Sequence, residues 1–459
     1  MIYRSRDTPI FISANLTPAT PKDLDTAQKV LESAKLVRNV RQALHHSDRA
    51  KEVTIVSRDG ELFGDVTKSF SAPCQLLESL CLRGIANSTF QWVFELPEAL
   101  FSNGPLRLRS LVLERCSIPF DEALLPRHCS QLTHLELHCV GPFGGQTILD
   151  ILSVATRLEI LIFDYLAPRM PSINGFPEPD SKKTINLSNL KILRFSDRPL
   201  TIYSVLRYLS FPETTSLSMQ CMIGGIASPP VFTLLTPHAS NGNPLRSMLM
   251  HPKIISSQRG IRLLAWTSSS PAPSLFYDKH PPPKIDVQFA RADGSDESIL
   301  RSAVFDLFST LPLRTVQVLT VARVRGVTPD LWAAILPSFR SLTELCVHGP
   351  HALRALCDAL RPGRMVPLAA MPGGVLLPNL ELLTIYEAVF RAETGEREAD
   401  FDALTKMLDI RKVKGRRLPR LVLCYSDVSR KDVEELAELV GSFVWDGSMQ
   451  GRSTVPVPL

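Results

Sequence analysis

The chain has 459 residues, of which 44% are hydrophobic, so it is long enough to bury a large core. Its formal net charge of +5 is small for this length and does not indicate nucleic acid as a partner. No uncharged apolar stretch reaches the roughly 18 residues that a membrane span requires. The start, Met1–Asp7, has no apolar core of a signal peptide, and the nine cysteines form no CxxC pair. We therefore expect reduced thiols, a cytoplasmic and/or nuclear location, and no membrane partner.

The first predicted element is a helix between Lys22 and His46 that caps the open end of the segments after it. From Ala50 onward one spacing recurs: an apolar residue is followed by others three and five positions later. The best copy, Leu108/Leu111/Leu113 followed by Cys116, fits the leucine-rich-repeat pattern LxxLxLxx(N/C). The copies begin at Ala50, Leu77, Leu108, Leu132, Leu158, Leu190, Thr214, Val316, Leu342, Leu380 and Leu418.

Helical periodicity separates several of these copies. Gln146–Thr156 has apolar residues on one face. Further along, Thr328 suits a helix N-cap and Pro329 suits the first helical position. A strand, a turn, a helix and the next strand at this spacing predict an α/β fold: a leucine-rich-repeat horseshoe solenoid with a parallel concave sheet, a helical outer side, terminal helical caps and an irregular insertion.

The insertion lies where the regular spacing is interrupted. Within it, Leu245–Met250 and Ile261–Trp266 predict a strand pair that 285–289 joins, and 296–311 predicts a helix. The Pro-rich and Ser-rich stretch 271–283 predicts a mobile loop. We expect five segments: 1–49, an N-terminal cap; 50–221, a first repeat array; 222–315, the insertion; 316–427, a second array; and 428–459, a cap helix over Arg430–Phe443 with a loose tail.

Catalytic motifs are absent from the sequence. The segment GPFGGQT lacks the lysine of a phosphate-binding loop, and no GxGxxG, GxSxG or HExxH occurs. His134 and His138 would lie about 13 Å apart in a strand, too far to share one metal ion. We expect no catalytic residue, no cofactor and no metal site, and therefore no enzyme. An enzyme with an unrecognised site in 222–315 remains an alternative.

The densest charged run is Arg411–Arg417, with five basic residues in seven positions. It could be a nuclear-import signal or a patch for an acidic partner. The alternative is a solvated loop between a helix and the last strand. A role in nucleic-acid binding would depend on this run alone, so we do not expect a nucleic-acid partner.

The concave face can be predicted from the alternation of side chains along a strand. If Leu111 and Leu113 point inward, Val112 and Glu114 point outward, and the same alternation applies to the following copies. The predicted partner-binding residues are Val112, Glu114, Glu136, Ile160, Ile162, Asp164, Ile192 and Arg194. Their apolar members should form a patch with a charged rim, which is typical of a binding site. Alternatively, the insertion covers this face.

Several segments also carry a resemblance to a known family. They are RSRDTPIFISANL (4–16), LESLCLRG (77–84), LRSLVLERC (108–116), IRLLAW (261–266) and FVWDG (443–447). In these segments the chain resembles the large, divergent F-box/leucine-rich-repeat proteins of mushroom-forming fungi. The resemblance implies an N-terminal F-box that docks the Skp adaptor of a cullin ubiquitin ligase, and repeats that bind a substrate.

The sequence departs from this family at its start, because no LPPE-like segment with its tryptophan precedes Arg4. Either an F-box precedes this chain, in which case the Skp adaptor and cullin are partners, or the protein is a paralogue without adaptor docking. We expect a non-enzymatic scaffold for protein–protein recognition, the substrate-binding region of an F-box-type ubiquitin ligase component. The alternative is a stand-alone leucine-rich-repeat inhibitor or assembly scaffold.

Overall fold

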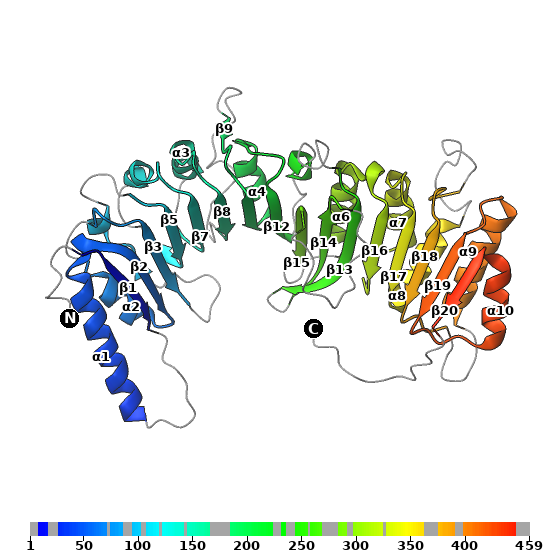
Figure 1. Ribbon diagram of the computed structural model, residues 1–459, viewed down its shortest axis with the longest axis horizontal. Coiled ribbons are helices and arrows are strands. Elements are labelled where there is room, and N and C mark those ends of the chain that lie inside the picture. The colour runs from blue at the N-terminus through cyan, green and yellow to red at the C-terminus, as the bar shows by residue number, and fades with distance from the viewer. Residues whose placement is uncertain are drawn as a thin grey trace. The chain divides into compact units, whose positions relative to one another are not determined.

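The protein has a mixed α/β fold with a mostly parallel main sheet, seen in a computed structural model (Figure 1). Contacts divide the chain into two compact units, Met1–Ser218 and Met219–Leu459. The structure describes residues 8–16, 26–70, 74–85, 94–101, 107–118, 122–141, 145–165, 184–223, 231–235, 244–255, 258–268, 283–291, 297–324, 327–361, 375–390 and 398–446. The α/β expectation is thus confirmed, while the five-segment division of the chain stays a prediction.

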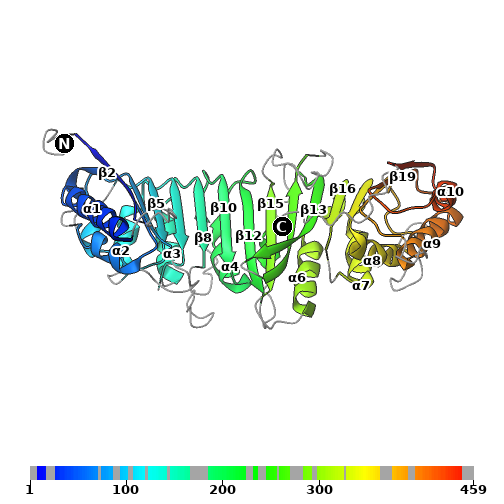
Figure 2. The same cartoon turned by 90° about the horizontal axis from the view of Figure 1, so that it is seen from below.

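In the first unit, the main strands follow one another in chain order and their described pairs are parallel (Figure 2). The strands are β1 (Ile10–Asn15), β2 (Ala50–Ser57), β3 (Ser79–Gly84), β5 (Ser110–Glu114), β7 (His134–His138), β8 (Ile160–Asp164), β10 (Ile192–Asp197) and β12 (Ser216–Ile223), which crosses the unit boundary. The helices are α1 (Thr26–Leu44), α2 (Gly60–Thr67), α3 (Gly145–Val154) and α4 (Pro199–Leu206). The helix predicted at 146–156 is therefore confirmed.

In the second unit, an antiparallel part precedes a parallel part. Strands β15 (Ile285–Arg291), β14 (Gln258–Trp266) and β13 (Ser247–Ile255) pair antiparallel, which confirms the strand pair predicted in the insertion. The parallel strands are β16 (Val318–Ala322), β17 (Glu344–His348), β18 (Leu382–Tyr386), β19 (Arg420–Cys424) and β20 (Ser442–Trp445). The helices are α6 (Glu297–Thr310), α7 (Pro329–Ile335), α8 (Pro350–Leu360), α9 (Ala399–Val413) and α10 (Arg430–Leu439).

Many of the sheet segments start with the same hydrogen bond. The amide N–H of Leu132 donates to the carbonyl of Cys129, and that of Leu158 donates to the carbonyl of Ala155. Leu77, Leu190, Val316, Leu342 and Leu380 make the same bond to the residue three positions earlier. These residues were predicted as the first apolar position of each copy, and each is at most 3% exposed.

One predicted first position is wrong. Thr214 is exposed, whereas Thr215 is fully buried and donates its amide N–H to the carbonyl of Pro212. The Thr215 hydroxyl also donates to the carbonyl of Leu190, 2.7 Å away. A buried hydroxyl needs such a partner, so this bond fixes Thr215 rather than its neighbour in the turn.

The end of many strands also repeats one conformation. Seven residues that directly follow a strand have a positive φ: Arg115, Cys139, Tyr165, Arg323, Gly349, Glu387 and Tyr425. The amide N–H of Arg115 donates to the carbonyl of His138 on the next strand, and that of Cys139 donates to Asp164 in the same way. The left-handed turn thus extends the sheet by one hydrogen bond before the chain leaves it.

Strands, and not helices alone, form the edges of the described sheet. At the N-terminal edge β1 pairs with β2, and α1 contacts β1. At the C-terminal edge the helix predicted over 430–443 ends at Leu439, and β20 then pairs with β19. Val440 leaves the helix in an extended conformation, and the amide of Ser442 bonds the carbonyl of Pro419. The chain after Leu439 therefore pairs with β19 as a strand and does not continue the helix.

Of the remaining local predictions, some are confirmed and some lie outside the described residues. Helix α6 confirms the helix predicted at 296–311, and the Thr328 hydroxyl caps α7 by accepting from the amide of Leu331. The predicted loop at 271–283, except Pro283, and the tail from Ser448 lie outside the described residues. Among the described residues, no helix has both the length and the apolar character needed to cross a membrane.

Candidate functional site

The predicted site residues lie together on neighbouring strands β5, β7, β8 and β10 of the first unit. Their side chains form three rows across the sheet, as the strand register shows. The rows are Ser110, His134, Ile160 and Ile192; Val112, Glu136, Ile162 and Arg194; and Glu114, His138, Asp164 and Ser196. The intervening residues, such as Leu135, Leu137 and Leu161, are buried. The predicted alternation is therefore confirmed, and we call this surface the row face.

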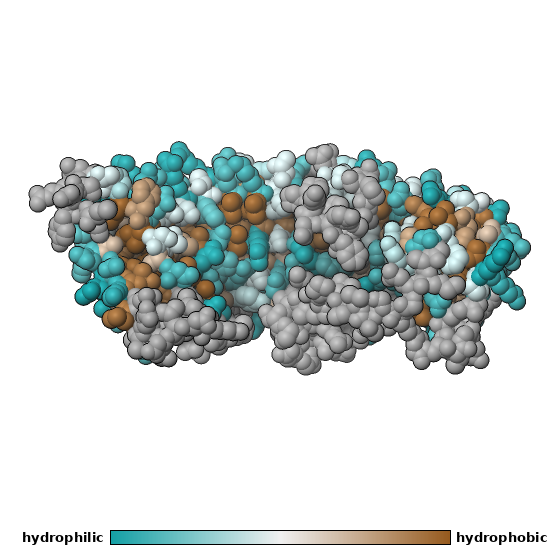
Figure 3. Space-filling model, turned by 60° about the horizontal axis from the view of Figure 1, so that its bottom comes forward, coloured by the Kyte–Doolittle hydropathy of each residue, from teal (hydrophilic) through white to brown (hydrophobic). Residues whose placement is uncertain are grey.

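The apolar surface of the row face is centred on two isoleucines. Ile192 is 42% exposed and pairs in register with the partly buried Ile160. Ile162, in the next row, is also partly buried. Figure 3 shows hydrophobic side chains in separate patches among hydrophilic ones on one face of the molecule. Val112, predicted as part of the patch, is only 5% exposed and offers a partner almost no surface.

A cluster of charged residues lies beside these isoleucines. Its members are Arg83, His134, Glu136, His138, Asp164 and Arg194, here called the charged cluster. Glu136 is its centre: its Oε1 lies 2.7 Å from Nε2 of His134, and its Oε2 lies 3.1 Å from both Nε2 of His138 and Nη2 of Arg83. Nδ1 of His138 lies 2.8 Å from Oδ2 of Asp164. Arg194 Nε approaches Oδ1 of Asp164 to 3.7 Å.

Hydrogen bonds within the charged cluster shift the pKa values of two of its members, His138 and Glu136. Burial disfavours the charged form of His138, but hydrogen bonds with Asp164 and Glu136 outweigh it and raise its pKa to about 9. Hydrogen bonds with His134 and His138 hold the pKa of Glu136 well below its usual range. At neutral pH the imidazolium of His138 therefore bridges two carboxylates. The two carboxylate side chains are 13% and 15% exposed, whereas those of Arg83 and Arg194 are 41% and 50% exposed.

Two parts of this arrangement were missed from the sequence. Alternation places His134 and His138 on the same side of the strand as Glu136, but their hydrogen bonds with this carboxylate were not predicted. Side chains two positions apart on a strand are about 7 Å apart, within reach of imidazole and carboxylate groups. That signal was present in HLELH. Arg83 carried no comparable signal, because its partner lies two strands away.

A second feature lies on the second unit. His348 stacks on Tyr386, with ring centroids 4.3 Å apart and planes 8° from parallel. Burial lowers the pKa of His348 to about 4, so its ring is neutral near pH 7. Arg323 and Glu387 are the left-handed residues that follow β16 and β18, and they form an ion pair in which Nη2 of Arg323 lies 2.6 Å from Oε2 of Glu387. His348 itself is buried, whereas the side chains of Arg323 and Glu387 are 40% and 39% exposed.

The basic run 411–417 has a structural explanation for most of its members. The guanidinium of Arg411, at the end of α9, is buried and donates to the carbonyls of Leu376 and Leu377. Lys412 and Arg417 both donate to the carbonyl of Glu438, near the end of α10. Cations suit a helix C-terminus, where the backbone carbonyls carry partial negative charge. Within this run only Arg411 is buried, and the exposed Lys412 and Arg417 link the end of α9 to the end of α10.

Comparison with known proteins supplies no relative: no protein-family model matches the chain, and no curated protein matches it. The function of the row face is therefore inferred from its geometry and chemistry.

Proposed function

We propose that the protein is a non-enzymatic leucine-rich-repeat scaffold that binds a partner protein on the row face. The observation that carries this proposal is the exposure of Ile192 beside Ile160, on a sheet surface where charged residues surround the apolar side chains. An apolar centre with a polar rim is the usual composition of a protein interface. Charged residues already fixed by one another need little reordering on binding, which favours recognition.

The repeat assignment draws support from the recurring backbone bonds. The same turn hydrogen bond starts many of the sheet segments. A residue in the left-handed conformation follows many of the strands. Neighbouring copies bury one continuous row of leucines, as stacked repeats do. Such an array presents a long, rigid strand surface, which suits a macromolecular partner better than a small substrate.

The biological role we propose is substrate recognition in an F-box-type ubiquitin ligase, in the cytoplasm and/or nucleus. This role rests on the sequence resemblance. The alternative is a stand-alone inhibitor or assembly scaffold. Purification of the endogenously tagged protein, with determination of its N-terminus, separates the two. A Skp adaptor and a cullin bound to a protein extended before Met1 support the ligase role. Other partners bound to a protein that starts at Met1 support the stand-alone scaffold.

The binding surface itself is tested by substitution. Ile160→Asp with Ile192→Asp places two carboxylates at the centre of the row face and should abolish partner binding. The matched control is Val154→Asp on helix α3, because Val154 is 37% exposed and lies outside the row face. Circular dichroism checks that both variants fold. If the double variant folds and retains every partner of the wild-type protein, the row face is not the binding surface.

A further inference from the structure

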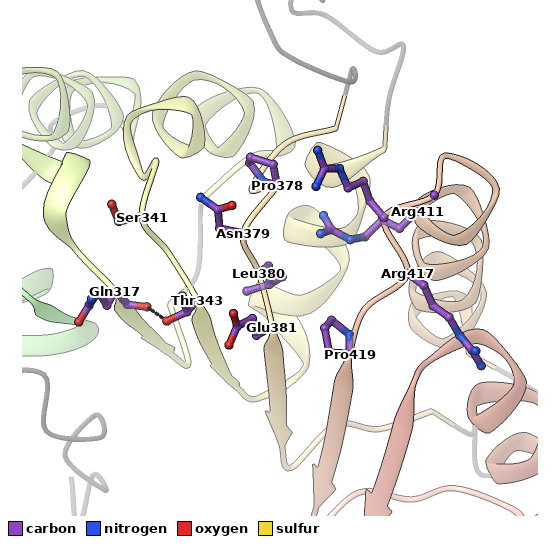
Figure 4. Close-up of a pocket in the computed structure, with 12 residues that line it drawn as sticks. Gln317, Ser341, Thr343, Pro378, Asn379, Leu380, Glu381, Arg411, Arg417 and Pro419 are labelled. Carbon is purple, nitrogen blue, oxygen red and sulfur yellow. Dashed lines mark hydrogen bonds between the residues drawn. The ribbon is translucent and has the colours of Figure 1, made fainter.

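The second unit contains an open cavity of about 530 Å³ beside the start of strands β17, β18 and β19. Figure 4 shows Arg411 and Arg417 on one side of it and Gln317 and Thr343 on the other. Glu381 and Arg416 also line it. The lining thus carries three guanidinium groups and one carboxylate, a formal charge of 3 − 1 = +2.

Arg411 is the unusual member of this lining. It is 1% exposed, and its Nη1 and Nη2 atoms donate only to the neutral carbonyls of Leu376 and Leu377. Its Nε atom is buried without a hydrogen-bond partner. No carboxylate forms an ion pair with it among the residues that the structure describes. Buried charges in proteins are ordinarily paired with an opposite charge, so this one favours an anionic ligand in the cavity.

Arg416 adds a second positive charge that no carboxylate of the described residues balances. Its amide N–H bonds the carbonyl of Arg411, and its positive charge adds to the effect of burial in lowering the pKa of Arg411 to about 10. Arg416 is exposed, and its guanidinium has no partner within the described part of the chain. Arg417 donates to a carbonyl and keeps its full charge. Two neighbouring guanidinium groups repel unless an anion lies between them.

We infer that this cavity binds a phosphate group, held by the exposed Arg416, with the buried charge of Arg411 beneath it and Arg417 nearby. Phosphate carries a charge of roughly −1.5 to −2 at pH 7, which balances the lining, whereas a carboxylate carries only one negative charge. Guanidinium groups also match the geometry of phosphate oxygens with paired donors. The inference does not depend on the partner proposed for the row face, which lies on the other unit.

Titration calorimetry of the full-length protein with inorganic phosphate, at constant ionic strength, tests this inference. Arg416→Gln removes an exposed donor without disturbing the core and should weaken phosphate binding about tenfold, as expected for one charge-assisted hydrogen bond. The matched control is Arg430→Gln, which removes the same charge from a 95% exposed side chain outside the cavity. That control should leave phosphate affinity unchanged.

Further ligands identify the source of the phosphate. A phosphoserine peptide that binds more tightly than inorganic phosphate indicates a phosphorylated partner, whereas equal affinity indicates a free phosphate compound. Both results support the site. Absence of phosphate binding, equal binding of acetate, or equal loss in the Arg416→Gln and Arg430→Gln proteins would overturn it.

Discussion

Arg83 bonds Glu136 across an intervening strand. Nη2 of Arg83, on β3, lies 3.1 Å from Oε2 of Glu136, on β7, and β5 runs between these strands. The side chain therefore crosses the outward surface of β5, where Val112 is 5% exposed. One ion pair thus explains both why Val112 offers no surface to a partner and why Glu136 is held in place at the centre of the charged cluster.

The coupling between Arg83 and Glu136 should be measurable as a free energy of unfolding. A double-mutant cycle with Arg83→Ala and Glu136→Gln should give a coupling free energy of about 1 kcal/mol. This is smaller than for a fully buried ion pair, because the Arg83 side chain is 41% exposed to solvent. The control pair is Lys191 and Glu159, which are 2.6 Å apart but 67% and 44% exposed. Urea denaturation should show a smaller coupling for this control. Equal couplings would contradict the role of burial.

Stability should fall as the solution becomes alkaline. The pKa of His138 is raised from 6.5 to about 9, so the folded state binds more protons than the unfolded state between these values. The stabilisation is complete below pH 6.5 and is lost as pH rises through about 9. A shift of this size corresponds to roughly 3 kcal/mol. Thermal melts should show a melting temperature that falls between pH 6.5 and about 9. The His138→Gln protein should lack this fall.

Stability should also fall as the solution becomes acidic, through a different histidine. Burial lowers the pKa of His348 from 6.5 to about 4, so the unfolded state binds more protons in this window. The contribution is present above pH 6.5 and is lost as pH falls through about 4. His348→Phe preserves the stack on Tyr386 and removes the titration. Its free energy of unfolding should depend less on pH between 4 and 6.5, and an unchanged slope would contradict this assignment.

Two glycines should respond oppositely to alanine. Gly349 has φ +82°, and an added Cβ would lie 3.2 Å from Cγ of Arg323, so Gly349→Ala should destabilise the protein by roughly 1–2 kcal/mol. Gly64 is in helix α2 with no atom within 4 Å of an added Cβ. Gly64→Ala should therefore stabilise the protein by roughly 0.5–1 kcal/mol. Urea denaturation measures both, and a stabilising Gly349→Ala would exclude strain at that turn.

The sequence by itself determined the strands that carry the recurring apolar spacing and the composition of the row face. Side-chain alternation is a property of the strand backbone, so Glu136, Ile160 and Ile192 could be assigned to one surface without knowledge of distant contacts. The regular spacing also aligned these strands in the correct register, because each begins at an equivalent buried leucine. The shift from Thr214 to Thr215 marks where this local rule failed.

Only the tertiary structure decided the edge strands, the charged cluster and the state of Arg411. Strand β20 has only four residues and β1 does not carry the recurring apolar spacing, so backbone pairing with a neighbouring strand defines both. Arg83 meets Glu136 only because β3, β5 and β7 are stacked, although 53 positions separate the two residues in sequence. Arg411 looked like a solvated cation within a basic run, but the packing of α9 buries it. Burial and long-range pairing depend on which segments meet, and local sequence patterns do not contain that information.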